Sequence, residues 1–101
     1  MVDGFAHEKV KELLNTKYGY NVYKIIAFQA RKIYMAFIYF KTDKELRLLT
    51  DSEKERIKSI YINYLETIGK IPNEIAKTMF NFDSDENVQK HYNGNYFYAT
   101  R

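Results

Sequence analysis

The chain has 101 residues, of which 46% are hydrophobic and 29% charged, and its formal net charge is +3. This length fits a single domain spanning residues 1–101, and the balance of apolar and charged residues is typical of a folded globular chain and excludes a disordered one. The sequence contains no cysteine, which excludes disulfides, thiolate nucleophiles and cysteine-ligated metals and favours the reducing cytoplasm.

Nothing in the sequence predicts insertion into a membrane. The first residues, Met1–Glu8, lack the apolar stretch of a signal peptide. The longest apolar run, Ile33–Phe40, has eight residues, whereas about 20 are needed to cross a bilayer as a helix. We therefore expect a cytoplasmic protein that has no membrane partner.

The first predicted element is a helix over residues 4–17. Its apolar residues recur at helical spacing: Phe5, Ala6, Val10, Leu13 and Leu14. Asp3 can cap the start of this helix, and Gly19 can adopt the positive φ that ends it.

Two runs dense in Val, Ile, Tyr and Phe follow, residues 20–29 and 32–41, and predict an antiparallel pair of strands. Because side chains alternate between the faces of a sheet, one face is expected to carry one apolar set: Val22, Ile26, Phe28, Met35, Phe37 and Tyr39. The opposite face is expected to carry a second set: Tyr23, Ile25, Ala27, Tyr34, Ala36, Ile38 and Phe40. Both faces of the pair are therefore apolar.

After the strand pair, Thr42–Glu45 predicts a turn and Leu46–Leu48 a short third strand. Thr50–Glu53 then forms a capping box, in which the threonine hydroxyl and the glutamate carboxylate satisfy backbone amides at the start of a helix. The apolar stripe of this long central helix recurs with helical spacing: Ile57, Ile60, Tyr61, Tyr64, Leu65 and Ile68. Gly69 and Pro72 end the helix.

Beyond Pro72 the pattern leaves alternatives open. Asn73–Met79 fits a short helix, whereas Thr78, Phe80 and Phe82 alternate as they would in a strand. Asp83–Glu86 predicts the start of another helix.

The end of the chain also allows two interpretations. Asn93-Gly94 fits either a hairpin turn or the left-handed end of the preceding helix, and Asn95–Thr100 predicts a strand. The elements together predict an α+β fold with an N-terminal helix, an antiparallel meander of two to three strands, a long central helix, short C-terminal helical segments and a final strand.

The sequence carries no recognisable catalytic, cofactor or metal site. Asp83–Asn87 matches the first half of a calcium-binding EF-hand loop, but Val88 and Gly94 stand where that loop needs Gly and Glu. His7 and His91 lie in no zinc-binding frame, and both the phosphate-binding glycine motifs and the G-x-S-x-G elbow are absent. We therefore expect a protein that is not an enzyme and uses no metal or cofactor.

The stretch between Glu12 and Asp43 has no acidic residue, and it holds eight aromatic residues together with five basic ones: Lys17, Lys24, Arg31, Lys32 and Lys41. A sheet that carries basic residues and stacking rings is typical of single-stranded nucleic-acid binding. The run Ala36–Phe40 also fits the last five places of the RNP1 pattern of RNA-binding sheets, although the glycine of that pattern is absent.

The doubly apolar sheet predicts a binding surface. The helices can cover one face of the sheet, and an uncovered apolar face on a monomer usually marks an interface. We therefore predict a non-enzymatic interaction or regulatory protein, of the kind that phages and plasmids encode as accessory factors, which binds another protein or a second copy of itself through an aromatic, basic sheet surface. The predicted partner-binding residues are Tyr23, Lys24, Arg31, Lys32, Tyr34 and Tyr39. The alternative is that the same sheet binds single-stranded nucleic acid.

Overall fold

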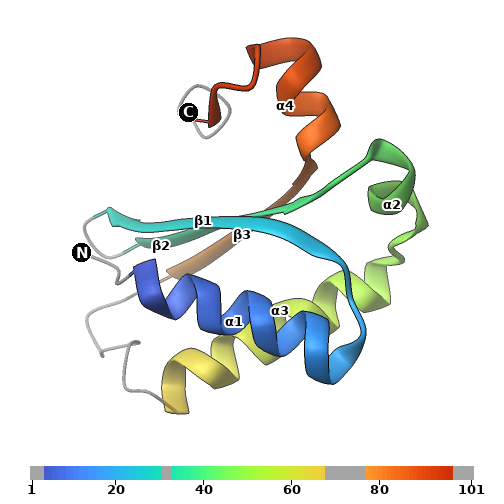
Figure 1. Cartoon of the computed structure of the whole chain (residues 1–101). Helices are drawn as coiled ribbons and strands as arrows, with labels where there is room; N and C mark the ends of the chain where they lie inside the picture. Colours follow the sequence, from blue (N-terminus) through green and yellow to red (C-terminus); the bar gives the residue numbers. More distant parts are fainter. Residues whose placement is uncertain (1–3, 31–32, 68–76, 97–101) are drawn as a thin grey trace.

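The computed structural model describes residues 4–30, 33–67 and 77–96 (Figure 1). In chain order its elements are α1 (Gly4–Tyr18), β1 (Val22–Ala30), β2 (Ile33–Phe40), α2 (Asp43–Leu48), α3 (Asp51–Thr67), β3 (Lys77–Ser84) and α4 (Asp85–Tyr92). The three strands form one sheet in the order β1-β2-β3. Helices α1 and α3 lie on one side of this sheet, and α4 stands on the other side at the end of β3 (Figure 1). The predicted α+β fold is confirmed.

The turn from α1 into β1 is held by backbone and side-chain bonds. Gly19 has a φ of 75°, which ends the helix as predicted, and the Tyr20 amide donates to the Leu14 carbonyl at 3.1 Å. The Asn15 side chain then bonds both backbone groups of Val22, at 2.8 and 2.9 Å. These bonds fix the first residue of β1 against the last turns of α1.

The sheet is mixed, because β1 pairs with β2 antiparallel and β2 pairs with β3 parallel. Parallel neighbours need a crossover connection, and here α2 and α3 supply it. The short third strand predicted over Leu46–Leu48 is wrong, since these residues end α2. The Thr42 hydroxyl accepts from the Glu45 amide at 3.2 Å and starts this helix, and β3 takes the place beside β2.

The core fills the space between the sheet and the two helices α1 and α3. Its fully or almost fully buried residues come from all of these elements: Val10, Leu14, Val22, Ile25, Ala27, Tyr34, Ala36, Ile38, Phe40, Ile57, Tyr61 and Leu65. The predicted stripe of the central helix is confirmed by its three buried residues, with Ile60 and Tyr64 packing beside them. Ile68 lies outside the described residues.

A β-bulge at the start of β1 changes the predicted assignment of two side chains to the sheet faces. The register shifts between Val22 and Lys24, so Val22 joins the buried face at 4% exposure while Tyr23 is 43% exposed. Strict alternation predicted the reverse. A bulge inserts one extra residue into a strand and therefore breaks the two-residue period.

The C-terminal alternatives are resolved in favour of a strand followed by a helix. Thr78, Phe80 and Phe82 alternate within β3, and Ser84 caps α4 by accepting from the Asn87 amide at 3.0 Å. Asn93 adopts the left-handed conformation with a φ of 52° and ends the helix, so the hairpin alternative is wrong. The strand predicted over Asn95–Thr100 falls mostly outside the described residues.

The most buried polar contact of the core joins two tyrosines. The hydroxyls of Tyr34 and Tyr61 lie 2.9 Å apart, and both side chains are at most 1% exposed. Their rings meet edge to face at 6.1 Å, and the Tyr61 ring also meets Phe80 at 5.3 Å. Each hydroxyl therefore depends on the other to offset its loss of water.

We expect Tyr34→Phe to lower the free energy of unfolding by about 1–2 kcal/mol, because it leaves the Tyr61 hydroxyl buried without a partner. The double variant Tyr34→Phe/Tyr61→Phe should lose less than the sum of the two single variants, since no orphan hydroxyl remains. Urea unfolding measures both effects. Tyr64→Phe, on the half-buried side of α3, is the control and should change stability by less than about 0.5 kcal/mol. A loss of stability in the double variant equal to the sum of the two single losses would contradict the hydrogen bond between the two hydroxyls.

Candidate functional site

The face of the sheet turned away from α1 and α3 carries six apolar side chains, of which five are half-buried and one is exposed. They are Ile26, Phe28, Ile33, Met35, Phe37 and Met79, and we name them the open sheet face. Phe28 and Phe37 sit on neighbouring strands and stack, with ring centroids 5.9 Å apart and an interplanar angle of 21°. Ile33 is 36% exposed at the far end. These six side chains form an apolar strip without a charged member.

At the other end of the same face, α4 and the residues after it close over the sheet. Tyr39 is completely buried there, and the ring of Tyr96 meets it edge to face at 4.8 Å. The Tyr96 hydroxyl donates to the carboxylate of Asp85, the first residue of α4. We name this group of residues the tyrosine clasp; it comprises Tyr23, Lys24, Tyr39, Lys41, Asp85 and Tyr96.

Two lysines complete the clasp. Lys41 places its ammonium 3.7 Å from the Asp85 carboxylate and 4.4 Å from the centroid of the Tyr23 ring. Lys24 places its own 4.3 Å from the centroid of the Tyr96 ring. Both are cation–π distances, so the clasp binds strand ends, α4 and Tyr96 into one unit.

The structure brings together three of the predicted partner-binding residues, and it places a fourth, Tyr34, on the opposite face of the sheet. Tyr23, Lys24 and Tyr39 all lie in the clasp, and Tyr23 and Lys24 are exposed. Arg31 and Lys32 lie outside the described residues.

Two of the predictions for partner-binding residues are wrong as regards exposure. Tyr34 faces the helices, because its position in β2 has the parity of the core residues Ala36 and Ile38, and its hydroxyl is bonded to Tyr61. Tyr39 lies on the expected face but is covered by Tyr96. Neither side chain can contact a partner in this structure.

Sequence reasoning missed Asp85 and Tyr96. They are separated by a helix and a left-handed turn, and no local spacing signals that the Tyr96 hydroxyl returns to the start of α4. Phe28 and Phe37 were assigned correctly to one face, but the choice of site residues favoured tyrosines and cations over plain apolar residues.

The clasp shifts the ionisation of its own groups. The hydrogen bond from Tyr96 is the main cause that holds the pKa of Asp85 below its usual value; burial opposes it, and Gln89 and Lys41 add to it. Burial first, and then the charges of Asp83 and Tyr92, raise the pKa of Tyr39 to about 12. Among the described residues, the Tyr39 hydroxyl is the buried polar side-chain atom that has no hydrogen-bond partner.

The described residues contain no arrangement typical of metal binding: nowhere in them do three His, Cys, Asp or Glu side chains come together. None of the described helices is long and apolar enough to cross a membrane. Comparisons with protein-family models, with curated proteins and with solved structures give no match for this chain. The candidate site is therefore argued from its own geometry.

We expect the protein to lose stability progressively as the pH rises above 10. An unperturbed tyrosine ionises near pH 10.0 and folded Tyr39 near 12, so between these values the unfolded chain binds fewer protons than the folded one and stability falls. Below pH 10 this contribution is fully present. Urea unfolding at a series of pH values, with tyrosinate absorbance read in parallel, measures the slope.

Tyr39→Phe is the matched variant for this measurement. Because the Tyr39 hydroxyl is buried without a partner, its removal should raise stability at neutral pH, by about 1 kcal/mol, while making the alkaline loss shallower. Wild type and variant with the same alkaline slope would contradict the burial of an ionisable Tyr39.

Proposed function

We propose that this chain is a small interaction protein without enzymatic activity, and that the open sheet face binds a second copy of the same chain. The observation that carries the proposal is the strip of six apolar side chains, five half-buried and one exposed, that lies opposite the packed face of the sheet. Soluble monomers rarely expose a contiguous apolar strip, and one that persists usually marks an interface.

The chemistry of the strip supports a protein surface as its occupant. Its aromatic members are Phe28 and Phe37, which have no polar atom to offer to water. By contrast, the interior places two tyrosines, Tyr34 and Tyr61, where their hydroxyls can only bond each other. Phenylalanine and methionine gain most from burial, so the strip is suited to contact with another apolar surface.

A second copy matches this surface in shape and charge. Two sheets that pack face to face lie about 10 Å apart with interdigitated side chains, and a two-fold axis brings the same strip onto itself. An axis in the interface and perpendicular to the strands keeps the basic ends of the two copies, with Lys24 and Lys41, at opposite ends. The net charge of +3 on each copy opposes this approach only weakly at physiological salt.

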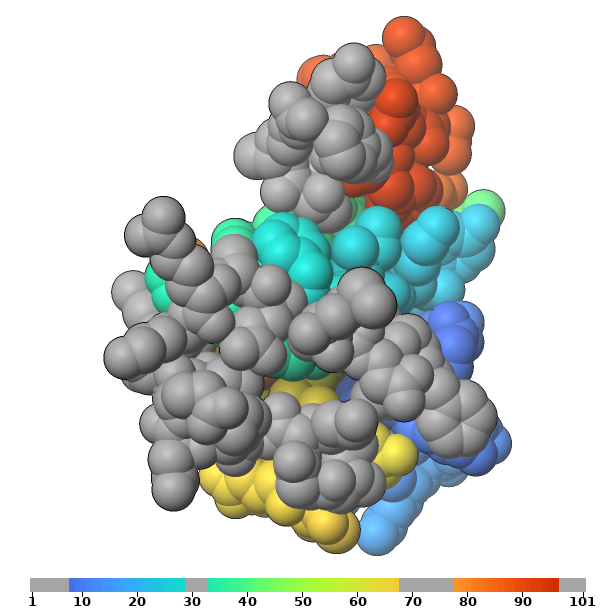
Figure 2. Space-filling view, turned by 90° about the vertical axis from the view of Figure 1, so that its left-hand side faces the viewer, coloured from blue at the N-terminus to red at the C-terminus, as the bar shows by residue number. Residues whose placement is uncertain are grey.

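Area sets a further condition on such a dimer. A three-stranded face eight residues long measures roughly 14 by 26 Å, whereas a stable interface buries about 800 Å² on each partner. Helix α4 forms a lobe that stands above the sheet (Figure 2), so it can flank the edge of the partner's sheet and enlarge the contact. The dimer is therefore expected to be of moderate affinity and to dissociate on dilution.

Sedimentation of the purified protein over a concentration series tests the proposal. We expect the mass to rise from that of a monomer to that of a dimer, and the double variant Phe28→Ser/Phe37→Ser to weaken the association by about 10- to 30-fold because it removes the centre of the interface. Circular dichroism should show an unchanged fold, since both side chains lie outside the core.

Leu48→Ser is the control, because it removes an apolar side chain of 70% exposure on α2 and leaves both the strip and α4 intact; it should associate like the wild type. A wild type that stays monomeric at the highest concentration, or a double variant that associates equally well, would overturn self-association through this face.

Single-stranded nucleic acid is a second candidate, and one observation favours it. Phe28 and Phe37 lie side by side on the face that no helix of the α1–α3 layer covers, and Tyr23 is exposed at the clasp beside two lysines. Proteins bind single-stranded nucleic acid in this way: its bases stack on aromatic rings of an open sheet, and basic residues nearby contact its phosphates.

If the face binds nucleic acid, a labelled oligonucleotide should bind at low salt, and its affinity should fall steeply as salt is added. Lys24→Glu should weaken this binding more than Lys44→Glu, which places the same charge change on the exposed side of α2. Fluorescence anisotropy measures both. The absence of binding at low salt would exclude this candidate.

A further inference from the structure

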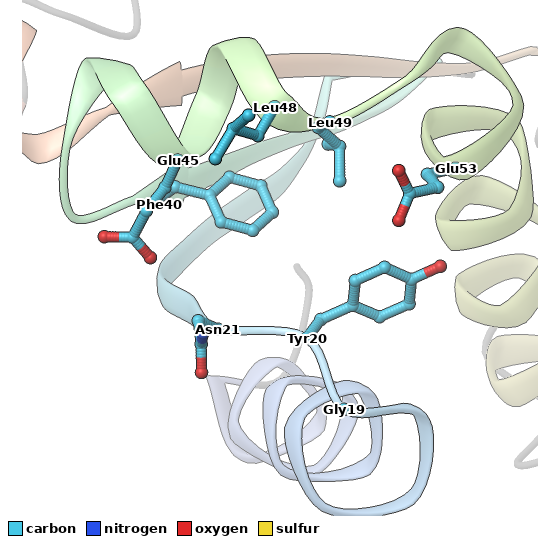
Figure 3. A pocket seen from close by; sticks show the side chains of 8 residues that line it. All are labelled: Gly19, Tyr20, Asn21, Phe40, Glu45, Leu48, Leu49 and Glu53. Carbon is cyan, nitrogen blue, oxygen red and sulfur yellow. The ribbon is translucent and has the colours of Figure 1, made fainter.

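A pocket of about 210 Å³ lies on the helix side of the molecule, where the turn from α1 to β1 faces α2 and the start of α3 (Figure 3). Two aromatic rings, two leucines and two carboxylates line it: Tyr20, Phe40, Leu48, Leu49, Glu45 and Glu53. It shares no residue with the open sheet face.

Both glutamates are held in place by the starts of helices. The Glu45 carboxylate accepts from the Thr42 hydroxyl at 3.2 Å. The Glu53 carboxylate accepts from the amide and the hydroxyl of Thr50, at 3.2 and 3.1 Å. In each case the printed bonds use only one carboxylate oxygen, Oε1. These hydrogen bonds therefore hold both negatively charged side chains in a defined position.

These charges have no cationic partner in the part of the chain that the structure describes. The ion pairs found there involve Glu8, Glu55, Glu86 and Asp85, and neither Glu45 nor Glu53 lies within 4.0 Å of a lysine or arginine nitrogen. In a chain of net charge +3, two fixed carboxylates at one pocket make a local site for a cation.

The walls of the pocket are apolar. Phe40 is 3% exposed and forms the inner wall, and the ring of Tyr20 lies beneath the carboxylate of Glu53 (Figure 3). Leu48, at the rim of the pocket, is 70% exposed. It belongs to α2, a helix with no buried residue.

We propose that this pocket receives an arginine side chain from a partner protein. The guanidinium is planar, stacks on aromatic rings and bonds carboxylates with its fork of N–H groups. Its alkyl stem lies along Leu48 and Leu49, its head lies against the ring of Tyr20 and the carboxylate of Glu53, and Glu45 adds a second negative charge at the opposite side of the pocket. Lysine meets the charge but not the stacking, so arginine is preferred. This inference uses a different surface from the open sheet face and stands or fails separately from it.

Titration of labelled protein with blocked arginine, N-acetyl-arginine methylamide, tests the proposal in amide NMR spectra. We expect saturable shifts at Gly19, Asn21, Leu48 and Leu49, with millimolar affinity because one side chain makes few contacts. The citrulline analogue has the same shape without the charge and should produce no saturable shift. The lysine analogue should bind more weakly than arginine.

Glutamine variants separate binding from helix capping, because glutamine also completes a capping box. Glu53→Gln should retain α3 and weaken arginine binding about 2- to 5-fold, the effect of one exposed charge pair. Glu45→Gln/Glu53→Gln should weaken binding about 4- to 25-fold, the product of two such effects. Glu66→Gln, on the exposed side of α3, should leave it unchanged.

Three results would overturn the proposal. Equal shifts with arginine and citrulline would show that charge is not recognised, and unchanged binding by the double glutamine variant would show that these carboxylates are not used. Unblocked arginine that binds at least tenfold more tightly than the blocked form would assign the pocket to a free amino acid instead of a partner protein.

Discussion

Strand β2 lies at the centre of the sheet, and both of its neighbours pair with it along its whole length, from Ile33 to Phe40. Its side chains alternate strictly, so one set of residues must enter the core and the other must point away from it. Tyr34, Ala36 and Ile38 enter the core and are at most 1% exposed. Ile33, Met35, Phe37 and Tyr39 therefore define the opposite face, and both proposed activities of the sheet depend on this alternation.

Within the described residues, α4 and Tyr96 return to the opposite face and cover it at Tyr39. The amide of Glu86 donates to the Lys41 carbonyl at 3.1 Å, and the Glu86 carboxylate accepts from the Asp43 amide at 2.8 Å. The Ser84 hydroxyl donates to the Asp43 carboxylate. These bonds, with the tyrosine clasp, join the end of β2, the start of α2 and the start of α4. Because α4 is anchored at its first residues, it stands on the sheet end, and the side chains of the open sheet face keep part of their exposure.

The sequence predicted the elements that depend on residues close together in the chain. It failed where contacts between distant parts of the chain decide the structure. The capping box at Thr50 and the stripe through Ile57 placed α3 correctly, since both depend on residues a few positions apart. The bulge at Val22 and the helix over Leu46–Leu48 were missed. A bulge is not signalled by the type of residue at which it occurs. The three residues Leu46–Leu48 are too few to distinguish the two-residue period of a strand from the helical period of about 3.6 residues.

The candidate site was predictable only in part for the same reason. That both faces are apolar follows from alternation, but which face the helices cover depends on how α1 and α3 pack. The choice of Tyr34 as a contact residue failed on this point, because a tyrosine is compatible with an interface and with a core that offers its hydroxyl a partner. The partner, Tyr61, lies 27 positions away and gives no local signal.

The distribution of aromatic residues bears on the origin of their abundance. The chain has ten tyrosines and seven phenylalanines, and a bias toward AT-rich codons raises both without regard to position. Solubility alone favours tyrosine on an exposed face and phenylalanine inside, because the hydroxyl gains from water. Here Tyr34 and Tyr61 occupy the interior while Phe28 and Phe37 stack on the open sheet face. Phe40 at 3% exposure and Tyr23 at 43% follow this preference, whereas the half-buried pair Phe28 and Phe37 departs from it. Under the proposed self-association, burial against a second copy completes the cover of this pair.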